Sequence, residues 1–117
     1  MTTLEKLRLF ERYLELLNGN ADETLDTVLD KLLERKRAEL ARYQDEMRAE
    51  LDAFEKRYNL TSAEFFEKFE RGELGDATDF FDWSATWQMY NDAQKYLRIL
   101  SEPPSFHLVL KSIESRT

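Results

Sequence analysis

The sequence predicts an all-α fold, in which a long central helix packs against a short N-terminal helix and a C-terminal helical hairpin in a bundle-like arrangement. Through most of the chain, large apolar residues recur every three or four positions, which is the spacing of one face of an α-helix. The 3 glycines and 2 prolines stand only between these periodic stretches. With 117 residues, 42% of them apolar, the chain suits a single domain with a modest core.

The first predicted helix runs from about Thr3 to Leu17. Its apolar residues stand three or four positions apart, and charged residues of both signs alternate on its other side. Asn18, Gly19 and Asn20 should close it, because glycine and asparagine tolerate the left-handed backbone conformation that ends helices. A short strand over residues 2–10 is the alternative interpretation of the same residues.

The long central helix is expected over residues 22–58, since neither glycine nor proline interrupts this stretch. At 1.5 Å per residue it would be roughly 57 Å long, which exceeds the diameter of a compact domain of this size, so it should bend or project. The polar run 34–38 divides its apolar stripe into two patches. The N-terminal helix can cover the first patch, residues 25–33, whereas the second patch, residues 40–58, needs the C-terminal half.

A third, short helix is predicted from a capping-box sequence that begins at Thr61. The Thr61 side chain can accept a hydrogen bond from the first turn, and Glu64 can reach back to the start of the helix. Leu60 and Phe65, on either side of this cap, suit a hydrophobic staple. Gly72 should end the helix.

The fourth predicted helix begins near residues 76–79, after a turn at 72–75, and is stopped by Pro103 and Pro104. Its apolar residues cover about 220° of its circumference, against about 100° for a helix that lies on a single core. Such a helix needs cover from two directions. One stripe carries Phe80, Trp83, Trp87, Tyr90 and Leu97, and the second carries Phe81, Ala85, Met89, Ala93, Tyr96 and Leu100.

Two interpretations of these stripes are open at this point. All of the aromatic residues could be core, or one stripe could meet another macromolecule, since Trp, Tyr and Met are enriched at the energetic centres of protein interfaces. A second copy of the chain would satisfy the same geometry. The pattern therefore predicts that the helix is covered, without saying by what.

By function, the chain divides into two parts within a single domain. Residues 1–58 hold the N-terminal helix and the long helix, which could serve dimerisation. Residues 59–117 form the aromatic and acidic half, which would bind a partner. The last segment, residues 105–117, could be a final helical turn or a strand, and its role stays open.

The net charge of −7, from 24 acidic and 17 basic residues, argues against a free-standing nucleic-acid-binding protein, which normally presents a basic face. Arg35, Lys36 and Arg37 form the one candidate for DNA contact, and they also suit an exposed helix face with ion pairs to nearby glutamates. The acids of the C-terminal half could be a solvated surface or a strip that attracts a basic partner. They recur at every third position: Glu64, Glu67, Glu70, Glu73, Asp76, Asp79 and Asp82.

No cofactor, metal site or catalytic centre is expected. The chain has no cysteine and a single histidine, His107, which does not suffice for the usual zinc sites. It has neither a phosphate-binding glycine loop nor the paired Glu-x-x-His ligands of a di-iron bundle. We therefore do not expect an enzyme. Since no signal-peptide pattern and no membrane-spanning apolar run is found, we expect a cytoplasmic protein without a membrane partner.

Two motifs of the C-terminal half resemble those of a known group. Residues 57–76, which contain a Gly-Glu-Leu-Gly-Asp turn, are followed by an Asp-Phe-Phe-Asp-Trp-Ser helix start at 79–84. Both are similar to motifs of small prokaryotic helical proteins from type II toxin–antitoxin pairs, and the likeness covers about residues 38–100. It implies an antitoxin that binds and neutralises a cognate toxin, an RNase.

The resemblance places the partner surface at the glycine turn and the start of the fourth helix, and the aromatic stripe adds Tyr90. The candidate partner-binding residues are Gly72, Glu73, Leu74, Gly75, Asp79, Phe80, Phe81, Asp82, Trp83, Trp87 and Tyr90. The first two helices resemble the dimerising part of a ribbon-helix-helix repressor, although residues 2–10 make a poor strand. Two alternatives stand beside the antitoxin: a homodimeric, coiled-coil-like scaffold or adaptor, and an acidic inhibitor that mimics nucleic acid.

Overall fold

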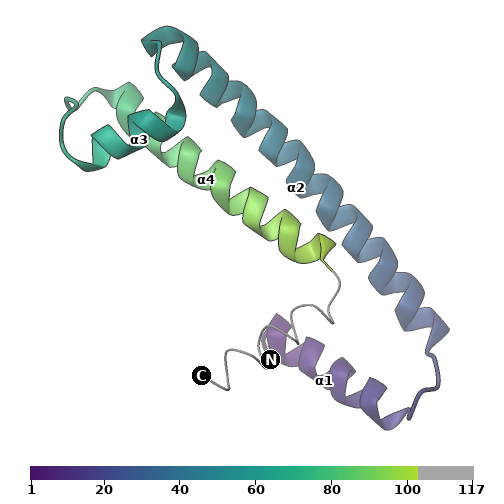
Figure 1. The fold of residues 1–117 in the computed structure, drawn as a ribbon. Coiled ribbons are helices and arrows are strands. Elements are labelled where there is room, and N and C mark those ends of the chain that lie inside the picture. The colour runs from purple at the N-terminus through teal and green to yellow at the C-terminus, as the bar shows by residue number, and fades with distance from the viewer. Residues whose placement is uncertain (103–117) are drawn as a thin grey trace. The chain divides into compact units, whose positions relative to one another are not determined.

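The computed structural model describes residues 1–102, and within them the fold is all-α, as predicted (Figure 1). The expectation for segment 105–117 and for His107 lies outside the described residues. The four helices of the described part are α1 (Thr3–Leu16), α2 (Glu23–Tyr58), α3 (Ser62–Glu70) and α4 (Thr78–Ser101). Each lies within a few residues of its predicted position.

The chain divides into two compact units, residues 1–35 and a second unit that begins at Lys36. The boundary falls inside α2, which is nevertheless one uninterrupted helix. It coincides with the polar run 34–38, where the sequence offers no large apolar side chain to hold neighbouring helices. The functional division into 1–58 and 59–117 stays a prediction.

In the first unit, α1 is a helix over the residues for which a strand was the alternative. The Thr2 side chain accepts a hydrogen bond from the Glu5 amide at 3.1 Å and so caps the first turn. The helix ends where predicted, because Asn18 and Gly19 take positive φ angles of 53° and 91°. Sequence-local signals therefore account for both ends of α1.

The first unit has no buried side chain among residues 1–35. Its turn is held by Asp22, which accepts hydrogen bonds from the Tyr13 hydroxyl at 2.9 Å and from the Leu25 amide at 2.9 Å. Leu25, like Leu29 and Leu33, is half-buried. The apolar patch at the start of α2 is thus only partly covered, and the leucines and Phe10 of α1 remain exposed.

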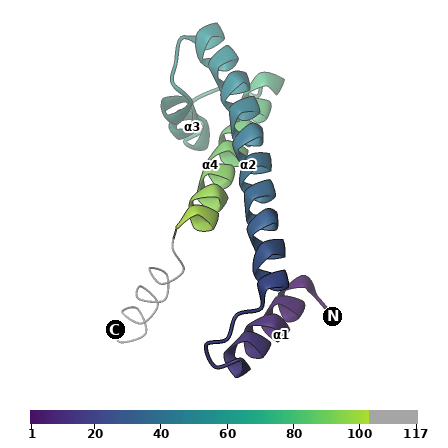
Figure 2. The ribbon, with the colours of Figure 1, turned by 90° about the vertical axis from the view of Figure 1, so that its right-hand side faces the viewer.

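In the second unit, α2 and α4 run side by side in opposite directions, as both views show (Figure 1 and Figure 2). Side-chain contacts along the seam fix this antiparallel register, because residues late in α2 meet residues early in α4. The pairs are Arg37 with Leu100, Tyr43 with Met89, Glu50 with Thr86, and Arg57 with Asp79.

The short helix α3 packs against α4, and the core of the second unit lies where these two helices meet α2. Its centre consists of Leu51, Phe65 and Trp83, each 0% exposed. The rings of Phe65 and Trp83 stack with their centroids 3.9 Å apart, and Phe54 stacks on Trp83 at 5.5 Å. The second apolar patch of α2 is therefore covered in part by the C-terminal half, as predicted: Leu51 and Phe54 belong to this core, whereas Tyr43 and Tyr58 stay exposed.

The end of α3 depends on Gly72. The Gly72 amide donates to the Phe69 carbonyl, and the Glu73 amide donates to the Lys68 carbonyl. These two bonds are those of a Schellman motif, in which the residue directly after the helix cap has a left-handed backbone conformation. That residue is Gly72, with a φ of +72°. The predicted glycine stop is confirmed, and it turns the chain toward α4.

Candidate partner-binding surface

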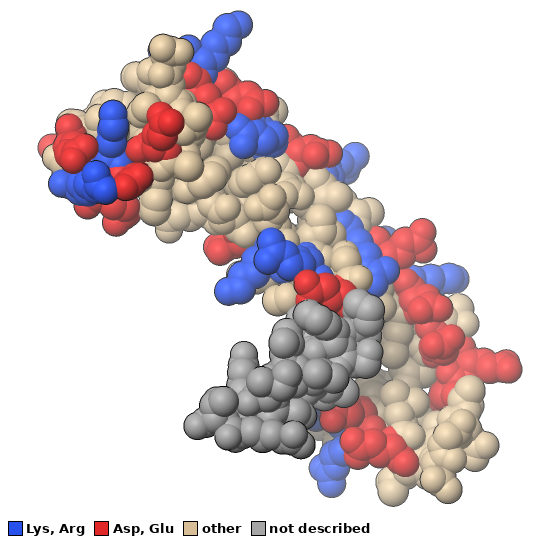
Figure 3. Space-filling model, viewed as in Figure 1, with Lys and Arg blue, Asp and Glu red and all other residues tan. Residues whose placement is uncertain are grey.

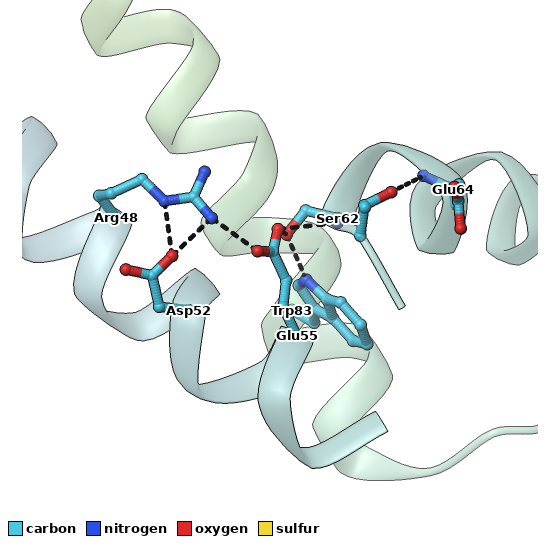
Figure 4. Close-up of polar contacts among 7 residues, drawn as sticks. Arg48, Asp52, Glu55, Ser62, Glu64 and Trp83 are labelled. Carbon is cyan, nitrogen blue, oxygen red and sulfur yellow. Dashed lines mark hydrogen bonds and ion pairs between the residues drawn. The ribbon is translucent and has the colours of Figure 1, made fainter. Parts of the chain in front are cut away.

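A chain of hydrogen bonds ties the three helices of the second unit together (Figure 4). The indole nitrogen of Trp83 in α4 donates to the Ser62 Oγ at 2.9 Å, and the Ser62 hydroxyl donates to the Glu55 carboxylate in α2 at 2.7 Å. The Ser62 amide donates to the same carboxylate oxygen at 2.9 Å. Arg48 completes the chain with an ion pair to Glu55 at 2.9 Å. The polar atoms of the buried Trp83 and Ser62 are thereby satisfied.

The ionised state of Glu55 is favoured by this network. Partial burial of the carboxylate opposes ionisation, but the hydrogen bonds from the Ser62 hydroxyl and amide and from Arg48 prevail and lower the pKa of Glu55. For Arg48, partial desolvation opposes the charge, but the hydrogen bonds to Asp52 and Glu55 prevail and raise its pKa. Both groups are therefore charged at neutral pH. The Glu55 carboxylate that accepts from Ser62 of α3 is thus ionised and paired with Arg48.

At the start of α3, only one half of the predicted capping box has its expected form. The Thr61 side chain accepts from the Glu64 amide at 3.2 Å, as expected. The carboxylate that accepts from an amide of this first turn is that of Glu55, which comes from α2. Because this carboxylate comes from another helix, no local sequence motif predicts the contact.

A second polar contact joins the end of α2 to the start of α4. The Asp79 carboxylate accepts from the Tyr58 hydroxyl at 2.6 Å and from the Arg57 guanidinium at 2.7 Å. The hydrogen bond from Tyr58 and the bond and charge of Arg57 lower the pKa of Asp79, and the same carboxylate raises the pKa of Tyr58. Asp79 therefore serves the fold of this chain, and it is less available to a partner than its neighbours.

The aromatic stripe that begins with Phe80 faces the core of the chain itself. Trp83 is fully buried, so its ring is part of the core and offers no surface to a partner. Phe80, Trp87 and Tyr90 are half-buried and pack against the core cluster, as does Leu74 of the turn. For these residues the structure favours the core interpretation over direct contact with another macromolecule.

The second stripe of α4 points outward along most of its length. Phe81 is 54% exposed, Met89 40% and Tyr96 52%, and only Ala93 in this stripe is buried. Ile99, which the sequence did not single out, is also exposed. Isolated exposed apolar residues are ordinary, but a row of them along one helix is the pattern of an interaction surface.

The turn and the acidic strip are exposed as well. Gly72, Glu73 and Gly75 lie at the surface, as does Asp82 in the first turns of α4. In the space-filling view, uncharged side chains form a broad area over α4, while charged ones gather over α3 and along α2 (Figure 3). At least one acid of α3 is paired within the chain, since Glu67 forms an ion pair with Arg71.

A groove follows the seam between α2 and α4, and on its α2 side only Lys36 was among the predicted site residues, as a candidate for DNA contact. It consists of two hollows of about 420 Å³ and 470 Å³ that share Met89. Residues that line it recur at seven-residue spacing, which is the spacing of a helix–helix seam. These positions are Lys36, Tyr43, Glu50 and Arg57 on α2, and Asp82, Met89 and Tyr96 on α4.

The basic run 35–37 has partners within the chain. The Arg37 guanidinium donates to the Leu100 carbonyl at 2.7 Å and so caps the C-terminal end of α4. Lys36 forms an ion pair with Glu39 at 3.0 Å. These contacts fit the interpretation of an exposed helix face, since the guanidinium of Arg37 is engaged with α4 and the charge of Lys36 is paired with Glu39.

Comparison of the chain with protein-family models, with curated proteins and with solved structures finds no match. Over residues 1–102, no helix is both long enough and apolar enough to cross a membrane. In the same part of the chain, no group of three or more His, Cys, Asp or Glu side chains is placed to hold a metal ion.

Proposed function

We propose that this protein binds and neutralises a basic protein partner, in the manner of an antitoxin that blocks an RNase toxin. The observation that carries the proposal is the outward stripe of α4, in which Phe81, Met89 and Tyr96 are each about half exposed. Acids surround it, among them Asp82 and Asp92, which are exposed on the same helix. An apolar centre with an acidic border is complementary to a basic protein surface.

The likeness of residues 57–84 to antitoxin motifs supports the same proposal. The motif residues have two different tasks in it. Gly72 and Trp83 shape the surface from inside, through the end of α3 and the core, whereas Phe81 and Asp82 would touch the partner. The motif thus serves as a scaffold with a small exposed contact area.

The test is capture of the protein encoded by the neighbouring gene, co-expressed with the full chain. Phe81→Ala should weaken capture about tenfold or more, because exposed aromatic anchors dominate interface energies. Leu16→Ala is the matched control, since Leu16 is 85% exposed but lies in α1. Capture that is equal for wild type and Phe81→Ala, or no capture by either protein, would contradict the proposal.

A homodimeric scaffold is the second candidate, and the first unit favours it. Residues 1–35 bury no side chain, although α1 alone exposes Leu4, Leu7, Phe10 and Leu14. A second copy that covers this face would form a four-helix arrangement. Light scattering of the purified chain separates the two candidates: a dimer that Leu7→Glu dissociates, with no affinity for a basic partner, would favour the scaffold.

A further inference from the structure

The groove between α2 and α4 has the shape of a site for a third helix. Its floor is apolar and is formed by Leu40, Tyr43, Phe54, Ala85, Met89 and Tyr96. The Tyr43 hydroxyl meets the Met89 sulfur at 3.3 Å where the two hollows join, so the floor continues across both helices. From Lys36 to Arg57 the groove extends roughly 30 Å, the length of a helix of about 20 residues.

The border of the groove is acidic. Glu39, Glu50, Asp79, Asp82 and Asp92 stand along it, against the two bases Lys36 and Arg57. Both bases are already in ion pairs with acids of the same border, Lys36 with Glu39 and Arg57 with Asp79. Within residues 1–102, Asp82 and Asp92 form no ion pair. The border therefore holds unpaired negative charge beside each hollow.

We infer that this groove binds a basic amphipathic helix of a partner protein. The apolar face of such a helix would lie on the floor, at Met89 and Tyr96, and its lysines or arginines would meet Asp82 and Asp92. The inference rests on the proposed function in one respect, since it names the kind of segment by which a basic partner would be held. It assigns that segment to the α2–α4 seam and not to the turn at 72–75.

A second copy of this chain is a poorer occupant. Its exposed amphipathic helix is α1, in which the acids Glu5, Glu11 and Glu15 balance the bases Lys6, Arg8 and Arg12. A helix without net positive charge gains nothing from the acidic border. An anionic lipid surface is excluded by the same charge, because the border would repel it.

The probe is a fluorescent 18-residue peptide of leucine and lysine with helical amphipathic spacing, titrated into the full chain and followed by anisotropy. The pair Asp82→Lys and Asp92→Lys should weaken binding about tenfold or more, as expected when charges next to a bound cation are reversed. The matched control is the pair Asp26→Lys and Asp30→Lys, which changes the net charge equally on exposed positions of the first unit. That control should change the affinity less than about threefold, because neither Asp26 nor Asp30 lines the groove.

The floor is tested separately by Met89→Gln, a neutral substitution at a position that is 40% exposed and so compatible with folding. It should weaken binding of the same peptide, while circular dichroism shows the helix content of wild type. Equal losses for the two charge-reversal pairs, no peptide binding at all, or unchanged binding by Met89→Gln would overturn the inference.

The outcomes also separate this inference from the proposed function. If the neighbour-encoded protein is captured and Tyr43→Ala, on the α2 side of the groove, leaves capture unchanged, the groove assignment fails and the proposed function stands. If the peptide binds the groove as described and no basic protein partner is captured, the proposed function fails and the groove assignment stands. Tighter peptide binding by a chain ending at Glu102 would assign the groove to the C-terminal segment and overturn the inference.

Discussion

The indole nitrogen of Trp83 donates a hydrogen bond to the Ser62 Oγ at 2.9 Å inside the core of the second unit. The bond joins α4 to the first residue of α3, and Ser62 in turn donates to Glu55 of α2. One tryptophan therefore connects all three helices that shape the outward face of α4. Its role is to hold that face in place from behind.

Loss of the Trp83 donor should destabilise the fold. Trp83→Phe keeps most of the buried ring but leaves the Ser62 hydroxyl without its donor, so we expect a loss of about 1–3 kcal/mol in the free energy of unfolding. Trp87→Phe is the control, because Trp87 is only half-buried and should cost less. Urea unfolding followed by circular dichroism measures both, and equal losses would contradict the assigned roles.

Acid should weaken the fold through Glu55. Its pKa in the folded state lies below the unfolded value of about 4.3, so the stabilisation is complete above that pH and is lost as the pH falls through the folded-state pKa. Glu55→Gln should therefore be less stable than wild type at pH 7, with a smaller further loss on acidification. Unfolding curves at pH 7 and pH 3 test this, with Glu46→Gln, on an exposed position of α2, expected to follow wild type.

The two glycines of the turn should respond differently to the same substitution. Gly72→Ala places a side chain at a φ of +72° and should cost about 1–2 kcal/mol of stability. Gly75→Ala should be nearly neutral, since Gly75 has no positive φ and an added Cβ would meet nothing within 4 Å. Thermal unfolding of the two variants is the measurement, and equal shifts would show that Gly72 does not end α3 as described.

Arg37 should stabilise the end of α4 and not a nucleic-acid complex. Arg37→Gln removes the guanidinium that donates to the Leu100 carbonyl, at a cost of about 1 kcal/mol or less because the contact is exposed. The effect should be local: amide hydrogen exchange in the last turn of α4 becomes faster, while Arg35→Gln leaves it unchanged. A loss of DNA affinity in Arg37→Gln without faster exchange would reverse this assignment.

Most of the fold could be predicted from the sequence because its signals are local. Thr2 and Thr61 cap helices, Gly19 and Gly72 end them, and the apolar spacing defines each buried face. The core interpretation and the interface interpretation of α4 could not be separated in the same way. Which stripe faces inward depends on the rotation of α4 against α2, and contacts distant in sequence such as Trp83–Ser62 fix that rotation.

Only part of the candidate site could be predicted, because it too depends on contacts between residues distant in sequence. Phe81 and Asp82 lie at the surface, whereas Trp83 and Asp79 are engaged within the chain. The groove needs residues from both α2 and α4, and their seven-residue spacing gains meaning only once the two helices are known to be adjacent.

The central claim is that α4 has a sealed inner side and an outer side that binds a basic protein. The most direct measurement is calorimetric titration of the neighbour-encoded protein into wild type and into the double variant Phe81→Ala, Met89→Ala, with the unfolding free energy of each chain determined in parallel. We predict that the double variant keeps the stability of wild type to within about 1 kcal/mol, since both side chains are exposed, and loses binding. Unchanged binding by the double variant would contradict the account, as would a loss of stability large enough to explain the loss of binding.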